Sequence, residues 1–358
     1  MTINGQACAT SHDAAVVDVV ALGESMVTFL PSRPGRLADV PSFERGIGGA
    51  ESNVACVLAA AGHRVRWIGR VGEDGFGDHL VDAIRSYGVD TSAVCRDPAR
   101  PTGVYFRTAG DRATDGHEVA YYRAGSAASA MAVENVDLDA VRSGRVLHLS
   151  GITAALSEDC LGLMRELTAR GPGRRPLVSF DVNHRPGLWR EAAGPRVLLD
   201  LARGADLVFV GDDEARDAWG LCGARAIRDA LPEPDVLVVK QGGGGATVFD
   251  STGDAGAEDA TFVPALRVDV VAAVGAGDAF AAGFLSATLR GLPARDRLRH
   301  GHLMAAAALT VPGDLGTPPS RGHADRLAAL DDGAWERLRL GPGWTEAVTR
   351  AAEEVRTP

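Results

Sequence analysis

Short, almost continuous apolar runs alternate along this chain with stretches of helical character. The clearest runs are residues 16–22, 65–71, 145–150, 177–182, 206–210 and 235–240. An apolar run of this length indicates a strand buried on both faces, as in a parallel sheet covered by helices. Strands that alternate with helices predict a doubly wound α/β fold. We therefore expect a mostly parallel sheet flanked by helices.

One region interrupts this alternation. Residues 103–107 and 118–123 are two short strands joined by a polar, glycine-bearing connection, which predicts a β-hairpin. With residues 28–45 it should form a small β lid. Val119, Tyr121 and Arg123 share one face by the two-residue period of a strand. An aromatic ring beside a guanidinium suits a carboxylate-bearing, oxygen-rich substrate, although a hairpin with solvated arginines has the same pattern.

The same reading divides the rest of the chain. Residues 1–14 are small and polar, and we expect a disordered leader. Residues 15–330 should form the α/β domain, and residues 331–358 a helical tail packed on it. The chain is long enough, at 358 residues, to bury a sizeable core.

The charge and cysteine content narrow the classes of function. The formal net charge of -10 argues against nucleic acid or an anionic membrane as the main partner. The five cysteines contain no CxxC pair, which is typical of reduced thiols in a cytoplasmic protein. No apolar run approaches the roughly 18 residues of a membrane-spanning helix. We expect a cytoplasmic protein that acts on a small molecule.

A small-residue turn, residues 275–278, opens an almost wholly apolar helix that ends near Gly291. The glycines Gly275 and Gly277 allow close approach to a ligand, and the free N–H groups of a helix start attract anions. Asp278 in the first turn should stay ionised and serve as a general base. An anion cradle that holds a carboxylate suggests phosphoryl transfer to a hydroxyl. A helix cap after a tight turn is the plain structural alternative.

A second glycine-rich stretch, residues 46–53, opens a helix of small residues. Its spacing is not that of a dinucleotide fingerprint, because Glu51 stands where GxGxxG from Gly46 needs its last glycine. This weakens the alternative of a nicotinamide-dependent dehydrogenase. Close approach of a small polar ligand, with Asn53 as a contact, explains the glycines, and tight helix packing explains them equally well.

Two further groups follow the carboxyl ends of predicted strands, where ligands bind in such sheets. One is the polar run of residues 181–185, which includes Arg185. The other runs from Lys240 through four glycines, residues 242–245. This loop has no GxxxxGK[ST] motif, so it is not a Walker A loop. It would admit a nucleotide, or serve simply as a flexible turn into the next strand.

These stretches together resemble the PfkB/ribokinase family of carbohydrate kinases over residues 18–316. The resemblance rests on two signatures in the right order, residues 48–53 and residues 275–284. Within the family, residues 49–55, 101–107, 121–127 and 181–189 are most similar to 2-keto-3-deoxygluconate kinases. The resemblance implies a ribokinase-like fold and ATP-dependent phosphorylation of a sugar or sugar acid, with 2-keto-3-deoxygluconate as the expected substrate.

The resemblance also implies roles for individual residues. Asp278 would accept the proton of the hydroxyl, beside an anion hole of Gly275, Ala276 and Gly277. The implied substrate-binding residues are Gly48, Gly49, Asn53, Tyr105, Tyr121, Arg123, Arg185 and Asp278. The implied nucleotide-binding residues are Lys240, Gly242, Gly243, Gly245, Gly275 and Gly277. ATP and Mg²⁺ are the implied cofactors.

Two positions depart from the family's usual pattern. Ala272 and Ala273 replace an Asp-Thr pair beside the family's potassium site, so we expect turnover that is nearly indifferent to K⁺. Gly211 replaces the Asn of an Asn-x-x-Glu pattern used for magnesium, while Glu214 keeps the last place and implies an indirect metal contact.

Two alternatives stay open because of these departures. One is a kinase for another ketose or a modified sugar, and the other is a sugar-binding pseudokinase with little activity. Neither nucleic acid nor a membrane is expected as a partner. An exposed hairpin offers an edge for pairing between subunits, so we expect a homodimer through the β lid.

Overall fold

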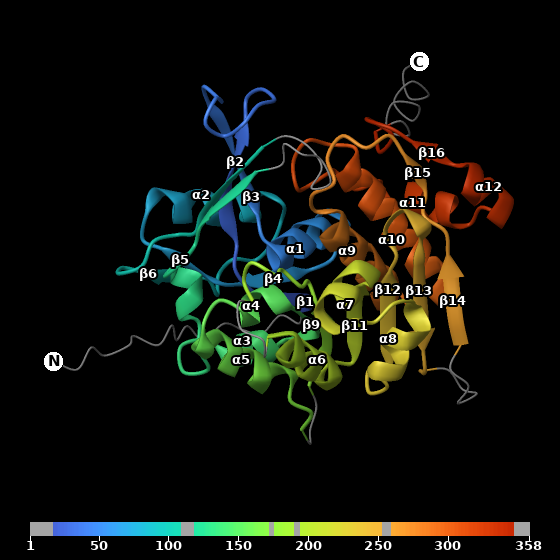
Figure 1. Ribbon diagram of the computed structural model, residues 1–358, viewed down its shortest axis with the longest axis horizontal. Helices are drawn as coiled ribbons and strands as arrows, with labels where there is room; N and C mark the ends of the chain where they lie inside the picture. The colour runs from blue at the N-terminus through green and yellow to red at the C-terminus, as the bar shows by residue number, and fades with distance from the viewer. Residues whose placement is uncertain (1–16, 109–117, 172–174, 190–193, 253–258, 347–358) are drawn as a thin grey trace, which may run out of the picture.

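The computed structural model describes residues 17–108, 118–171, 175–189, 194–252 and 259–346 (Figure 1). Its centre is an eight-stranded sheet in the order β14-β13-β12-β11-β10-β9-β1-β4. Its strands are β1 (Val17–Leu22), β4 (Val65–Ile68), β9 (Gly144–Ser150), β10 (Leu177–Asp181), β11 (Leu207–Gly211), β12 (Val236–Lys240), β13 (Ala246–Asp250) and β14 (Asp259–Val263). Neighbours from β4 to β12 are parallel, whereas β13 and β14 add an antiparallel edge. The predicted mostly parallel α/β sheet is confirmed.

Both faces of this sheet are buried, which explains its apolar strands. In β1, Val19 and Ala21 pack into one core cluster, and Val20 and Leu22 pack into the other. The first cluster is covered by α1 (Ala50–Ala60), α2 (Gly75–Ser86), α9 (Ala276–Leu289), α10 (Ala294–Leu309), α11 (Arg321–Ala328) and α12 (Asp332–Arg337). The second is covered by α3 (Leu138–Arg142), α4 (Gly151–Ala154), α5 (Glu158–Thr168), α6 (Gly194–Gly204), α7 (Asp212–Trp219) and α8 (Ala224–Ala230).

A separate four-stranded sheet forms the predicted β lid and projects beyond the central sheet (Figure 1). Its order is β3-β2-β7-β8, with β2 at Met26–Pro31, β3 at Phe43–Gly48, β7 at Val104–Arg107 and β8 at Val119–Tyr122. Strands β7 and β8 are antiparallel, so the predicted hairpin is confirmed. Phe29 and Phe106 stack with ring centroids 4.6 Å apart and form part of the lid's own core.

Residues 65–71 form two strands, so the expectation of a single strand is wrong. The chain leaves the main sheet at Gly69, and β5 (Arg70–Gly72) pairs with β6 (Cys95–Asp97). A Cβ at Gly69 would lie 2.5 Å from Trp67 Cζ2, so only glycine permits this change of direction.

The tail after residue 330 is partly extended. Beyond α12, β16 (Arg339–Leu340) pairs in parallel with β15 (Arg267–Val268). Buried Trp335 fixes α12 to the core. The expected leader, residues 1–14, and the end of the tail, residues 347–358, lie outside the described residues.

Candidate active site

Strands β10, β11 and β12 end side by side and place polar groups at one edge of the sheet. Asp181 ends β10 and Lys240 ends β12, with Gly211 of β11 between them. The Lys240 ammonium donates to Asp181 Oδ2 at 2.9 Å and to Oδ1 at 3.1 Å. Burial alone would lower the pKa of Lys240, but the carboxylates of Asp181 and Glu214 outweigh it and hold the pKa above its ordinary value. Lys240 is therefore a fixed positive charge.

The turn before α9 lies next to the Lys240 ammonium. Gly275 caps α9 with φ +75°, and none of the described side chains caps this helix start. A Cβ at Gly275 would collide with the backbone carbonyl oxygen of Asp314. At Gly277 a Cβ would lie 3.7 Å from Lys240 Nζ. Uncapped amides of a helix start beside a buried ammonium favour a bound anion, and the anion hole at Gly275, Ala276 and Gly277 stays a prediction.

Asp278 lies in the first turn of α9, partly buried, and its Oδ2 accepts from Asn53 Nδ2 at 2.8 Å. Burial raises the pKa of Asp278 to about 7, and the nearby Asp181 carboxylate raises it further. The Asn53 hydrogen bond and the charges of Lys240 and Arg185 lower it, but by less. This pKa lies above that of an ordinary aspartate, as the sequence did not predict, because burial outweighs the favourable partners. A carboxyl that titrates near neutral pH is well suited to accept a proton.

Glu214 and Arg185 complete the cluster at this edge. Glu214 Oε2 accepts from the Gly211 backbone N–H at 2.8 Å. Arg185 Nη1 forms an ion pair with Glu214 Oε1 at 3.6 Å. Burial raises the pKa of Glu214 against the opposing charge of Lys240. Replacing Asn by Gly at 211 thus leaves Glu214 anchored through the backbone. In the described part of the chain, no group of three or more His, Cys, Asp or Glu side chains could hold a metal ion.

Three of the predicted sugar-binding residues, Gly48, Asn53 and Tyr105, lie around this turn or around Asp314 beside it. Tyr105 of β7 is buried, and its hydroxyl donates to Asp314 Oδ2 at 3.1 Å. A Cβ at Gly48 would lie 2.9 Å from the same Asp314 oxygen and would overlap the Tyr105 hydroxyl. Gly49 likewise packs against Glu24 and Ser52. Close packing thus explains both glycines. The Asn53 side chain, by contrast, forms a hydrogen bond with Asp278.

Arg123 has a partner that the sequence did not indicate. Its guanidinium forms an ion pair with the carboxylate of Glu24, and both side chains are largely buried. Glu24 Oε1 also accepts from Ser126 Oγ at 2.8 Å. The neighbouring Tyr121 is 50% exposed, and Arg123 lies over its ring, 5.8 Å from the centroid. The charge of Arg123 is therefore already compensated by the protein.

The glycine loop after β12 is open. Residues Gly242–Gly244 form a short 3₁₀ turn, and all three are exposed. No atom of the described chain would lie within 4 Å of a Cβ at Gly242 or Gly243. Gly245 has φ +136° and packs against Val263. The first glycines thus leave space for a ligand, and the last one makes the turn into β13.

Three site residues were not predicted from the sequence: Glu24, Arg107 and Asp314. Arg107 donates to Asp314 Oδ1 at 3.1 Å, and this pair joins residues 207 positions apart. Asp314 lies among Tyr105, Gly48 and the Gly275 turn. Its one local signal is a Pro-Gly-Asp turn after an apolar helix, which by itself indicates only a loop.

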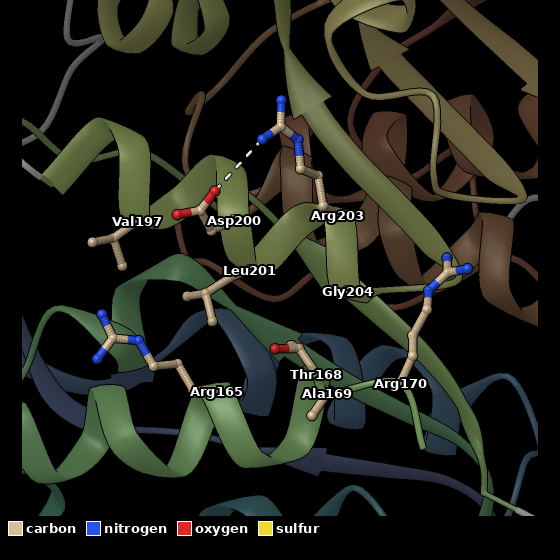
Figure 2. Close-up of a pocket in the computed structure, with 9 residues that line it drawn as sticks. All are labelled: Arg165, Thr168, Ala169, Arg170, Val197, Asp200, Leu201, Arg203 and Gly204. Atoms are coloured by element: carbon tan, nitrogen blue, oxygen red, sulfur yellow. Dashed lines mark ion pairs between the residues drawn. The ribbon is translucent and has the colours of Figure 1, made fainter. Parts of the chain in front are cut away.

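A hollow of about 360 Å³ lies elsewhere, between α5 and α6 (Figure 2). It is at the amino ends of the central strands, opposite the edge that carries Asp278. Its three arginines point apart in Figure 2, and two of them are engaged: Arg170 with backbone carbonyls and Arg203 with Asp200. Without converging charges this hollow is a weaker candidate for the active site than the edge around Lys240.

Known proteins match this chain over most of its length. A model described as "pfkB family carbohydrate kinase" matches residues 16–321. A 2-dehydro-3-deoxygluconokinase of Bacillus subtilis is 35% identical over 326 residues, 88% of this chain and 95% of the relative. A probable chloroplastic fructokinase-6 of Arabidopsis thaliana is 30% identical over 309 residues, 82% of this chain and 77% of the relative.

Solved structures agree with this assignment. A PfkB protein from Polaromonas has a TM-score of 0.75 and 34% identity, and the match covers 86% of this chain and 99% of that one. A fructokinase with bound ATP from Xylella fastidiosa has a TM-score of 0.71 and 25% identity, covering 86% and 97%. The resemblance inferred from the two glycine signatures is thus confirmed. The chain belongs to the pfkB family of carbohydrate kinases.

Proposed function

We propose that this carbohydrate kinase transfers the γ-phosphoryl group of ATP to a hydroxyl of 2-keto-3-deoxygluconate, with Asp278 as the general base. The observation that carries the mechanism is the placement of Asp278 in the first turn of α9, beside uncapped amides and under Lys240. The substrate is supported by the 35% identical relative named 2-dehydro-3-deoxygluconokinase. Arg185 at the strand edge and Tyr121 with Arg123 on the lid are the proposed contacts of the sugar acid.

The positions of the side chains support the following proposed steps. The Asn53 amide holds one Asp278 oxygen at 2.8 Å and so orients the carboxylate. Asp278 takes the proton of the substrate hydroxyl as that oxygen attacks the γ-phosphorus in line, and the bond from this phosphorus to the bridging oxygen breaks, so that ADP leaves. Lys240 and the amides of Gly275, Ala276 and Gly277 stabilise the charge on the transferred group. The lid covers the sugar and excludes water from the reaction.

Glu214 and the glycine loop are the proposed places for Mg²⁺ and ATP. Mg²⁺ is usually held by one or two carboxylates together with substrate phosphates and water. Glu214 is a carboxylate of this kind next to Lys240 and would act indirectly, whereas both oxygens of Asp181 accept from Lys240. When bound, the ion would neutralise phosphate charge. Gly242, Gly243 and Gly245 would line the nucleotide.

An ADP-release assay over a panel of sugar acids and ketoses tests the proposal, followed by Asp278→Asn on the preferred substrate. We expect the highest kcat/KM for 2-keto-3-deoxygluconate. The variant should retain ATP binding and lose about 10²–10⁴-fold in kcat, the usual contribution of a general base. Turnover of the variant at the wild-type rate would remove Asp278 from this role.

A neutral ketose such as fructose is the second candidate, and a specific contact favours it. Glu24 already neutralises Arg123, which lowers the attraction of this position for a substrate carboxylate. Arg123→Ala separates the two candidates. For a sugar acid we expect KM to rise about 10–150-fold, since a charged hydrogen bond is worth roughly 1.5–3 kcal/mol. Equal losses on a sugar acid and on the matching neutral sugar would favour the ketose.

The protein is further proposed to act in the cytoplasm. Its buried cysteines Cys56 and Cys160 are free thiols, and burial raises the pKa of Cys56 to about 12 and that of Cys160 to about 11. Unreactive free thiols are typical of a reducing compartment. No helix in the described ranges is long and apolar enough to cross a membrane.

A further inference from the structure

The lid and the anion turn are joined by a buried ion pair. Arg107 ends β7. Its guanidinium Nη2 donates to Asp314 Oδ1 and to the Pro312 carbonyl oxygen, both at 3.1 Å. The Arg107 side chain is 4% exposed and that of Asp314 is 5% exposed. Removing two charges from water is costly, so such a pair needs good geometry and further hydrogen bonds. Here the further bonds come from Pro312 and from Tyr105.

Asp314 in turn contacts the turn that carries the base. Its backbone carbonyl lies where a Cβ of Gly275 would be, so residue 314 forms one wall of the turn. Burial raises the pKa of the Asp314 carboxyl, against the favourable Arg107 charge and the hydrogen bonds of Tyr105 and Arg107. Asp278 follows Gly275 by three residues, and its Oδ2 accepts from Asn53 Nδ2 at 2.8 Å.

From this continuous set of contacts we infer that Arg107 is a positioning residue for sugar phosphorylation, acting through Asp314 on the Gly275 turn and on Asp278. The lid strand β7 supplies the charge that fixes Asp314, and the Asp314 backbone packs against the Gly275 turn, which leads directly into Asp278. The inference rests on the proposed role of Asp278. Arg107 itself contacts neither Asp278 nor the Gly275 turn, so its effect would pass through Asp314.

A double-variant cycle tests this inference on whichever sugar the wild type phosphorylates. We expect Arg107→Met and Asp314→Asn each to lower kcat/KM for the sugar by about 10–100-fold, and the double variant to lose no more than the larger single loss. The KM for ATP should change less than about twofold, and Arg107→Lys should regain part of the lost kcat/KM because it keeps the charge. Losses that multiply in the double variant, or equal rises in both KM values, would overturn the inference.

Arg142→Met is the matched control, since Arg142 pairs with Glu166 at the same 3.1 Å but both side chains are half exposed. It should leave kcat/KM unchanged. Backbone hydrogen exchange gives a readout without any sugar: Arg107→Met should speed exchange in residues 275–279 and 310–316, and Arg142→Met should not. Unchanged exchange overturns the inference, whereas a wild type that phosphorylates no sugar overturns the proposed function instead. If Arg107→Met does not fold, Arg107→Gln, which also removes the charge, replaces it in the cycle and in the exchange experiment, with the same criteria.

Discussion

Asp278 determines the first prediction at the scale of single residues. Because its pKa lies at about 7, protonation removes the proposed base as the pH falls through neutrality. We expect kcat/KM for the sugar to decline below about pH 7 and to approach a tenfold loss per pH unit at lower pH. The profile is measured from pH 5 to 9 at saturating ATP. A flat profile between pH 5 and 8 would contradict a base with this pKa.

Glu51 gives a second prediction, which concerns stability. Its side chain is fully buried, Oε1 accepts from Ser150 and Thr153 at 2.8 Å each, and Oε2 has no hydrogen-bond partner among the described residues. Burial raises the pKa of Glu51 to about 7. The folded state thus binds a proton more tightly than the unfolded state, so the free energy of unfolding falls as the pH rises from about 4.5 to 7.

Glu51→Gln removes this titration. Relative to the wild type, the variant should gain about 1–3 kcal/mol in the free energy of unfolding between pH 5 and pH 8, since one pKa unit corresponds to about 1.36 kcal/mol. Urea unfolding at the two pH values measures the difference. Glu166→Gln on the surface is the control and should show no such gain. A difference between Glu51→Gln and wild type that is the same at both pH values would refute the argument.

Sequence patterns indicated the groups of the site but not their partners. Asp278 and Lys240 were predicted because each stands in a local context, a helix start or a strand end, that determines its chemistry. The pairs of Glu24 with Arg123 and of Arg107 with Asp314 join distant segments, and no local pattern specifies which buried charges meet. For the same reason the raised pKa of Asp278 was missed, because burial is a tertiary property.

At the scale of elements, the strands that are buried on both faces were the ones that the sequence predicted best. Strands β1, β9, β10, β11 and β12 were predicted closely because both of their faces pack against helices. The edge strand β14 (Asp259–Val263) was not predicted, since a strand at the edge with Phe262 54% exposed lacks a continuous apolar run. The split of residues 65–71 was missed because it depends on contacts of Gly69 with Trp67.

The turn before α9 gives a prediction that contrasts two glycines. Gly275→Ala is strained twice, by φ +75° and by collision with the Asp314 backbone, so we expect a loss of more than about 1 kcal/mol in stability together with lower kcat. Gly277→Ala meets only Lys240 Nζ, at 3.7 Å, and should fold normally but raise the KM for ATP. Thermal unfolding and ATP titration of both variants measure this. Equal stability losses would show that the turn is not constrained by Asp314.

The segment before this turn leads to a prediction about K⁺. The Val271 and Ala272 backbone N–H groups donate to the Leu309 carbonyl at 2.8 and 3.3 Å, so α10 holds the segment where the family has its Asp-Thr pair. We expect turnover to differ less than about twofold between K⁺ and Na⁺ at fixed ionic strength, which must be held constant because screening alters any site that handles ATP. Clear activation of the unmodified protein by K⁺ would mean that backbone carbonyls still form the cation site.

At the scale of the whole molecule, the lid is a small sheet with a free edge. Strand β8 pairs only with β7, so its other side is unpaired among the described strands. Tyr122 on β8 is 66% exposed and Tyr121 is 50% exposed. Exposed aromatic residues on a sheet edge favour pairing with another chain. A second copy of the lid is an occupant with the same edge and the same aromatic groups, and a closed twofold pairing would cover both.

We therefore predict that the protein is a homodimer through its lid, and Tyr122→Lys tests this. A lysine on an edge strand blocks pairing, so the variant should dissociate at least tenfold more readily than wild type in sedimentation velocity experiments at micromolar concentration. Tyr122 is preferred to Tyr121 because Tyr121 is a proposed sugar contact. Tyr87→Lys, on α2 with 38% exposure, is the control and should leave the dimer intact. A monomeric wild type would mean that the lid edge is exposed to solvent. A dimer that Tyr122→Lys does not weaken would mean that the interface lies elsewhere on the molecule.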